Sequence, residues 1–173
     1  MLDHVMNMFF ITRTVFLVVN IILLYIFLTP GRSYGFQILV FVLTWIATYV
    51  LRPLLYLLNL DPLLASYLVG LLYLLPCVLI FKESFHAKFF IFFMIFTLTQ
   101  LTFLVFTYID HFLSPAIPQT FILAGLLLEA AALPLIRRYM KSPVKDAIEI
   151  LTQHNLSFTL FPVLSFVLLT CYA

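Results

Sequence analysis

The chain has 173 residues, of which 65% are hydrophobic and 9% are charged, and its formal net charge is +2. Soluble domains carry about 25% charged residues, so the composition excludes a water-soluble fold and indicates a membrane protein. The apolar runs over 89–96 and 121–128 are nearly continuous, whereas the strands of spanning barrels alternate apolar and polar residues. We therefore predict spanning helices, each of about 20 residues.

The predicted fold is all-α: a polytopic bundle of six transmembrane helices forming one domain over 1–173, with a short amphipathic interfacial helix before the last. The first span, about 9–28, includes Arg13, because 15–28 alone is shorter than the about 17 residues that a span needs. No Lys or Arg precedes it, unlike in a cleavable signal peptide, so we expect this helix to be retained. Pro30-Gly31-Arg32-Ser33 favours a turn into the second span, about 34–51.

Prolines delimit the next elements. We expect Arg52-Pro53 to end the second span, and Asp61-Pro62 to supply the N-cap and first-turn proline of the third, about 62–81. The charged link Lys82–Lys88 precedes the fourth span, about 89–108. The loop Asp110–Gln119 precedes the fifth span, about 120–136.

An amphipathic segment follows the fifth span. It opens with a basic cluster, Arg137, Arg138, Lys141 and Lys145. Ser142-Pro143 is a second N-cap and first-turn pair, so we predict that a separate short helix begins there. Apolar residues recur at helical spacing, at Val144, Ala147, Ile148 and Leu151, while Lys145, Asp146 and Glu149 occupy the other face. The sixth span is predicted at about 156–172.

The distribution of Lys and Arg predicts the orientation. Seven of the nine lie in the links between spans one and two, three and four, and five and six; only Arg13 and Arg52 lie on the opposite side. We therefore expect these links in the cytoplasm and both termini outside, in a bacterial inner membrane.

Glu129 is the one acid deep in a predicted span, about seven residues or roughly 11 Å from the inner helix end. Thr97 and Gln100 of the fourth span are expected at a similar depth. Two hypotheses follow: Glu129 hydrogen-bonds Thr97, Gln100 or a backbone carbonyl and so holds helices together, or it takes part in ligand binding or signalling. The small residues around it, Gly125 among them, should let another helix approach closely.

No catalytic constellation is evident. Asp110-His111 and Asp3-His4 are predicted on the same outer side, but nothing completes a coordination shell, so no metal site is expected. Cys77 with His86 lacks an orienting third group, and a thiol in an apolar helix should be inert. We expect no cofactor, no nucleic-acid partner and no enzymatic activity of the chain by itself.

Three segments carry a resemblance to a known family: Phe81-Lys82-Glu83-Ser84-Phe85-His86-Ala87-Lys88, Arg137-Arg138-Tyr139-Met140-Lys141 and Leu160-Phe161-Pro162-Val163-Leu164-Ser165. In this order, within roughly 35–173, they resemble the N-terminal transmembrane sensor region of GHKL-type bacterial sensor histidine kinases, the group that includes quorum-sensing peptide receptors.

The resemblance implies the sensor of a two-component histidine kinase, which binds an extracellular ligand such as a peptide and works as a homodimer. The kinase core has no counterpart in this sequence, so a truncated sensor is expected. From topology alone, the ligand would contact the outer helix ends near Asp61, Asp110 and His111.

Two alternatives stay open. Substrate-binding subunits of energy-coupling transporters are also six-helix proteins of about this size, but should have both termini inside. A structural or assembly protein could dock a partner or anionic lipid through Ser142–Leu151 and the basic cluster.

Overall fold

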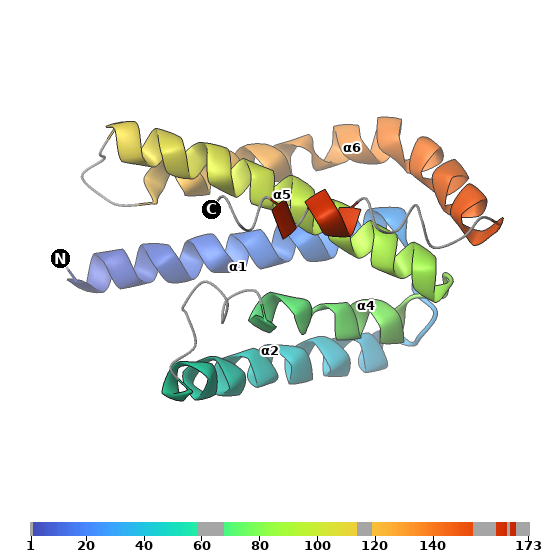
Figure 1. The fold of residues 1–173 in the computed structure, drawn as a ribbon, viewed down its shortest axis with the longest axis horizontal. Coiled ribbons are helices and arrows are strands. Elements are labelled where there is room, and N and C mark those ends of the chain that lie inside the picture. The colour runs from blue at the N-terminus through green and yellow to red at the C-terminus, as the bar shows by residue number, and fades with distance from the viewer. Residues whose placement is uncertain (1, 59–67, 114–118, 154–161, 166, 169–173) are drawn as a thin grey trace. The chain divides into compact units, whose positions relative to one another are not determined.

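The computed structural model describes residues 2–58, 68–113, 119–153, 162–165 and 167–168. Its elements are α1 (Leu2–Phe27), α2 (Tyr34–Leu57), α4 (Leu74–Ile80), α5 (Phe85–Leu113) and α6 (Thr120–Gln153), shown in Figure 1. These residues contain no strand beyond one isolated bridge, so the predicted all-α class is confirmed.

In the part of the chain that the structure describes, three helices are long and apolar enough to cross a membrane: Tyr34–Leu55, Phe85–Leu113 and Thr120–Ile150. Two shorter apolar helices cover Ile11–Phe27 and Leu68–Ile80. Their length and composition are compatible with a membrane protein. The predicted sixth span, about 156–172, lies mostly outside the described residues, and so does the beginning of the third.

Helices continue past prolines that were expected to delimit them. α2 contains Pro53 and reaches Leu57, so the prediction that Arg52-Pro53 ends it is wrong. α6 contains Pro134 and Pro143, so the predicted separate amphipathic helix is the second half of a longer one. A proline removes one hydrogen bond and kinks a helix, and α6 bends toward its C-terminal end (Figure 1). Where water is absent, continuing the helix keeps the other backbone groups paired.

α5 is longer than predicted at both ends. It begins at Phe85, so Lys88 lies in a helix rather than in a link, and it ends at Leu113, so Asp110 and His111 belong to its last turns rather than to a loop.

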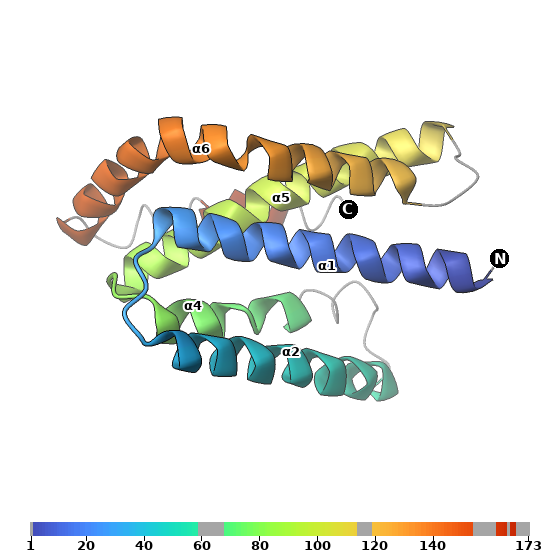
Figure 2. The ribbon, with the colours of Figure 1, turned by 180° about the vertical axis from the view of Figure 1, so that it is seen from behind.

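The chain divides into two compact units. Unit 1 comprises Met1–Phe27 and Phe90–Ala173, and unit 2 comprises Leu28–Phe89. In unit 1, α1 packs along α6 (Figure 2). The Phe16 ring of α1 meets Phe96 and Phe103 of α5 edge to face, at centroid distances of 6.2 and 6.3 Å. Aromatic packing therefore joins α1 to α5.

In unit 2, α2 packs against α4 (Figures 1 and 2). The two links of this unit are hydrogen-bonded to each other: the Gly31 N–H donates to the Ile80 carbonyl at 2.8 Å, and the Lys82 N–H donates to the Thr29 carbonyl at 3.0 Å. We call residues 29–32 and 80–83 the clasp. Because the clasp joins the two links, they lie at the same end of the unit, as the predicted topology requires.

Lys88 stabilises the end of α4. Its side chain is buried, and its ammonium group donates to the Val78 carbonyl at 2.9 Å. The last carbonyls of a helix lack intrahelical donors and carry partial negative charge, so a cation is favourable there. The buried Cys77 thiol donates in turn to the Lys88 carbonyl at 3.7 Å.

Candidate functional site

A close helix contact in unit 1 is built on Gly125 of α6. Gly125 is buried, and a Cβ atom at this position would overlap the Phe106 ring of α5. The absence of a side chain is what lets the ring lie against the α6 backbone. The prediction that a small residue near Glu129 permits close approach is therefore confirmed at Gly125.

Glu129 lies one turn further along α6, on the same face as Gly125. Its side chain is only 8% exposed, and neither carboxyl oxygen has a hydrogen-bond partner among the described residues. Thr102 of α5 is the polar side chain beside this carboxyl, but its hydroxyl donates to the Leu98 carbonyl, at 3.3 Å. A buried, unpaired acid is thus present in an apolar helix contact.

Asp110 closes the other end of the same contact. Its carboxylate accepts hydrogen bonds from the backbone N–H of Gln119 at 2.8 Å and of Phe121 at 3.1 Å. The first N–H groups of a helix have no intrahelical acceptor, so Asp110 acts as an N-cap supplied by the preceding helix. Gln119 has φ of 69°, the left-handed region. The carboxylate thereby holds the last turns of α5 to the first turn of α6.

These contacts form one antiparallel face. Asp110 bonds Phe121, Phe106 packs on Gly125, and Thr102 interacts with Glu129. Each pair lies four residues further along both helices, and we call these three contacts the α5–α6 seam. Figure 1 shows the two helices that supply them. Along α6 it covers about 12 Å between Phe121 and Glu129. The capped first turn of α6 and the buried acid thus lie on one face of this helix.

The pairing expected for Glu129 is wrong. No hydrogen bond joins it to Thr97 or Gln100, and the Thr97 hydroxyl is itself buried without a partner among the described residues. The register of the seam explains the difference, because it brings Thr102 opposite Glu129. Thr97 is five residues, or roughly 7.5 Å, further along α5.

The outer residues predicted to contact a ligand are only partly described. Asp61 lies outside the described residues. His111 is exposed in the last turn of α5, beside Phe112 at a ring distance of 6.3 Å. Asp110 and His111 are thus adjacent, with the carboxylate engaged by α6.

The basic cluster lies on the second half of α6. Arg137, Arg138 and Lys145 are exposed and Lys141 is half-buried, and the Arg138 guanidinium stands 5.5 Å from the centre of the Tyr139 ring. The amphipathic pattern is confirmed where it is described: Val144 is buried, Ala147 and Ile148 are half-buried, and Lys145, Asp146 and Glu149 are exposed.

One buried polar pair was missed. The Thr99 hydroxyl lies 2.9 Å from Asn20 Oδ1 and 2.8 Å from the Ile95 carbonyl, and both side chains are at most 2% exposed. The pair joins α1 to α5. The available signal was the single amide in the apolar run 15–27, since such residues commonly hydrogen-bond between membrane helices.

Among the residues that the structure describes, no three His, Cys, Asp or Glu side chains could hold a metal ion together. No protein-family model, no curated protein and no solved structure matches the chain. The site is therefore argued from its own geometry.

Proposed function

We propose that the chain is the membrane sensor domain of a bacterial two-component histidine kinase, and that it detects an external ligand, such as a peptide, through the α5–α6 seam. The observation that carries this proposal is the position of Asp110. Its carboxylate holds the first turn of α6 at the predicted outer end, and the same seam leads to the buried, unpaired Glu129.

The first step is competition for the Asp110 carboxylate. A ligand that presents N–H donors or a cation beside His111 would take the place of the Gln119 and Phe121 amides. The first turn of α6 would then lose its cap, and α6 could shift along α5. A ligand drives such a change only as far as it binds one arrangement better than the other.

The second step concerns Glu129. A buried polar group without a partner costs about 1–3 kcal/mol, so an arrangement that gives this carboxyl a donor is favoured by a similar amount. In the proposed mechanism the seam has a second arrangement, in which this carboxyl meets a donor, and ligand binding selects that arrangement. We expect the output to pass to a second copy in a homodimer and to need no catalytic residue of this chain.

Sidedness tests the proposal. We would fuse paired reporters, one active only outside the cytoplasmic membrane and one fluorescent only in the cytoplasm, at position 116, within Ser142–Lys145 and after Ala173. The sensor requires position 116, in the sequence between α5 and α6, to be outside, and it predicts the fusion after Ala173 outside as well. Position 116 in the cytoplasm would overturn the proposal.

The runner-up is a substrate-binding subunit of a small-molecule transporter, in which Glu129 would bind a cationic part of the substrate. Its favouring observation is the same unpaired carboxyl. This function requires both termini in the cytoplasm, so the reporter after Ala173 separates the two. In a structural or assembly role the basic cluster would dock a partner, and neither Asp110 nor Glu129 would be needed. Substitutions at Asp110 and Glu129 should then leave the function unchanged, whereas they should impair a sensor.

A further inference from the structure

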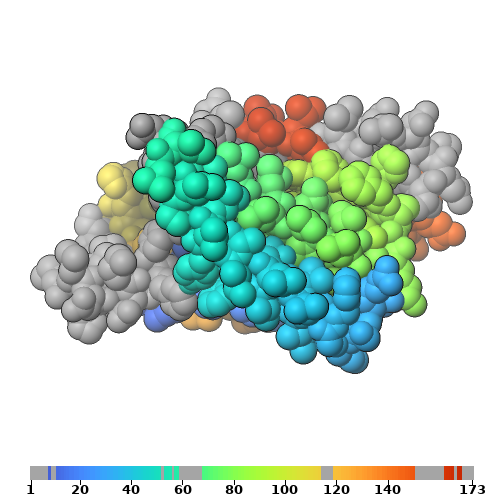
Figure 3. All heavy atoms as spheres, turned by 90° about the horizontal axis from the view of Figure 1, so that it is seen from below, coloured from blue at the N-terminus to red at the C-terminus, as the bar shows by residue number. Residues whose placement is uncertain are grey.

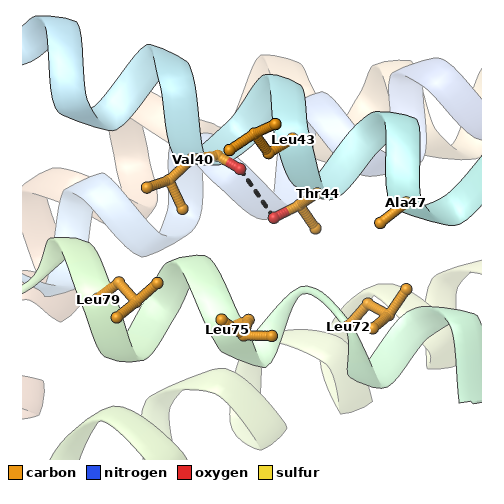
Figure 4. Close-up of a pocket in the computed structure, with 7 residues that line it drawn as sticks. All are labelled: Val40, Leu43, Thr44, Ala47, Leu72, Leu75 and Leu79. Carbon is orange, nitrogen blue, oxygen red and sulfur yellow. Dashed lines mark hydrogen bonds between the residues drawn. The ribbon is translucent and has the colours of Figure 1, made fainter.

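Unit 2 contains an apolar groove between α2 and the segment Leu68–Ile80, with a volume of about 240 Å³. The residues that line it are Val40, Leu43, Thr44, Ala47, Leu72, Leu75 and Leu79, shown in Figure 4. The Thr44 hydroxyl donates to the Val40 carbonyl at 2.8 Å, so its proton is already used within the helix. The groove thus offers an aliphatic surface.

The groove leads toward an exposed arginine on the α2 side. Phe36 lies one turn before Val40 on the same face of α2, and the Arg32 guanidinium stands 5.7 Å from the centre of the Phe36 ring. Arg32 is exposed. A cation is therefore held at the clasp end of this wall by an aromatic ring.

The other wall leads to a lysine. Lys82 follows Leu79 by three residues and is exposed. Its side chain lies against Gly31, because a Cβ atom added to Gly31 would lie 2.5 Å from Lys82 Cγ. The acid of the clasp, Glu83, accepts the Thr29 N–H at 2.7 Å through one oxygen, and its other oxygen is buried. Arg32 and Lys82 are thus the charges that the clasp presents to solvent.

The surface around the groove also suits lipid. α2 exposes large apolar side chains along its length, among them Ile38 at 64% and Val50 at 65%, and Figure 3 shows this helix, coloured blue to teal, on one face of unit 2. In a membrane-spanning helix such a face contacts acyl chains. Clusters of Arg and Lys beside membrane helices attract anionic headgroups.

We propose that unit 2 binds an anionic phospholipid, with one acyl chain along the α2–α4 groove and the phosphate between Arg32 and Lys82. Both parts of the lipid find a matching surface within one unit: the chain meets aliphatic side chains, and the phosphate meets two exposed cations at the end of the groove. The inference rests on unit 2 alone and does not depend on a sensor role.

Native mass spectrometry of the delipidated full chain tests the proposal, with phosphatidylglycerol and phosphatidylcholine as the probes. We expect preferential binding of phosphatidylglycerol, weakened about tenfold to thirtyfold in the double variant Arg32→Gln/Lys82→Gln, as expected for two interfacial cations. Arg13→Gln, which removes an exposed cation outside both the clasp and the basic cluster, is the control and should bind as the wild type does. Helical content and melting temperature verify that each variant folds.

A second variant tests the groove itself. Ala47→Phe should fill it and weaken phosphatidylglycerol binding, whereas Val50→Phe, on the exposed face of α2, should not. Soluble glycerol phosphate should fail to compete, because it lacks the acyl chain. The proposal would be overturned by equal binding of both lipids, by binding that Arg32→Gln/Lys82→Gln does not change, or by full competition from glycerol phosphate. It would also be overturned if the protein formed a dimer that Ala47→Phe abolishes and no lipid adduct were seen.

Discussion

The Asp110 carboxylate, in the last turns of α5, accepts a hydrogen bond from the Phe121 backbone N–H in the first turn of α6, at 3.1 Å. The bond crosses from the last turns of α5 to the first turn of α6, so it fixes the register of the two helices there. Phe106 with Gly125 and Thr102 with Glu129 follow in the same register. The N-cap of one helix is thereby linked to a buried acid two turns away.

Asp110→Ala should destabilise the protein by about 0.5–2 kcal/mol, because the first N–H groups of α6 lose their acceptor. Thermal unfolding in detergent should show a lower melting temperature. Asp146→Ala, at an exposed position of α6, is the control and should change the melting temperature little. Equal effects of the two substitutions would mean that Asp110 does not act as the cap.

Gly125→Ala should destabilise unit 1 by about 1–3 kcal/mol, because the added methyl group overlaps the Phe106 ring. Gly35→Ala is the matched control, since nothing lies within 4 Å of the position its Cβ would take. Phe106→Leu should restore part of the loss in the Gly125→Ala background but not in the Gly35→Ala background. Additive effects of Gly125→Ala and Phe106→Leu would show that the two residues are not in contact.

Glu129→Gln should leave the melting temperature unchanged or raise it, because neither carboxyl oxygen loses a hydrogen bond and an amide is cheaper to bury than a charge. If Glu129 instead held helices together, the same substitution would lower the melting temperature. Glu149→Gln, on the exposed side of α6, controls for the charge change. Any response to a ligand should be lost in Glu129→Gln and kept in Glu149→Gln.

Thr99→Val should destabilise unit 1 by about 0.6–1.7 kcal/mol, the range for hydrogen bonds between membrane helices, because it leaves Asn20 Oδ1 without the hydroxyl. Thr107→Val is the control, since the Thr107 hydroxyl is exposed and donates to the Phe103 carbonyl of its own helix. Melting curves compare the two, and a loss of similar size at both positions would contradict a role in joining α1 to α5.

The helices over 9–27, 34–51, 89–108 and 120–136 could be predicted because apolar runs of spanning length suit only helices. Their ends could not, because Arg52-Pro53 and Ser142-Pro143 read equally well as boundaries and as kinks inside a helix. Whether such a pair ends the helix or kinks it depends on how the neighbouring backbone groups are hydrogen-bonded. The identity of a few adjacent residues does not contain that information.

The candidate site was only partly predictable for a similar reason. Glu129 stands out as an acid in an apolar run, and Gly125 as a small residue beside it. Its neighbour Thr102 follows from the register of α5 against α6, which side-chain packing sets. Asp110 was expected to meet a ligand, whereas its carboxylate caps α6; Lys88 was assigned to a link, whereas it is buried at the end of α4.

The measurement that tests the central claim most directly is amide hydrogen exchange of Asp110→Asn against wild type, with the full chain in lipid nanodiscs. If the α5–α6 seam couples the cap to the buried acid, exchange should rise along α6 from Thr120 to beyond Glu129, while α4 exchanges as in the wild type. Faster exchange confined to the first turn of α6 would show that the cap acts locally, and would contradict the coupling on which the proposed sensor depends.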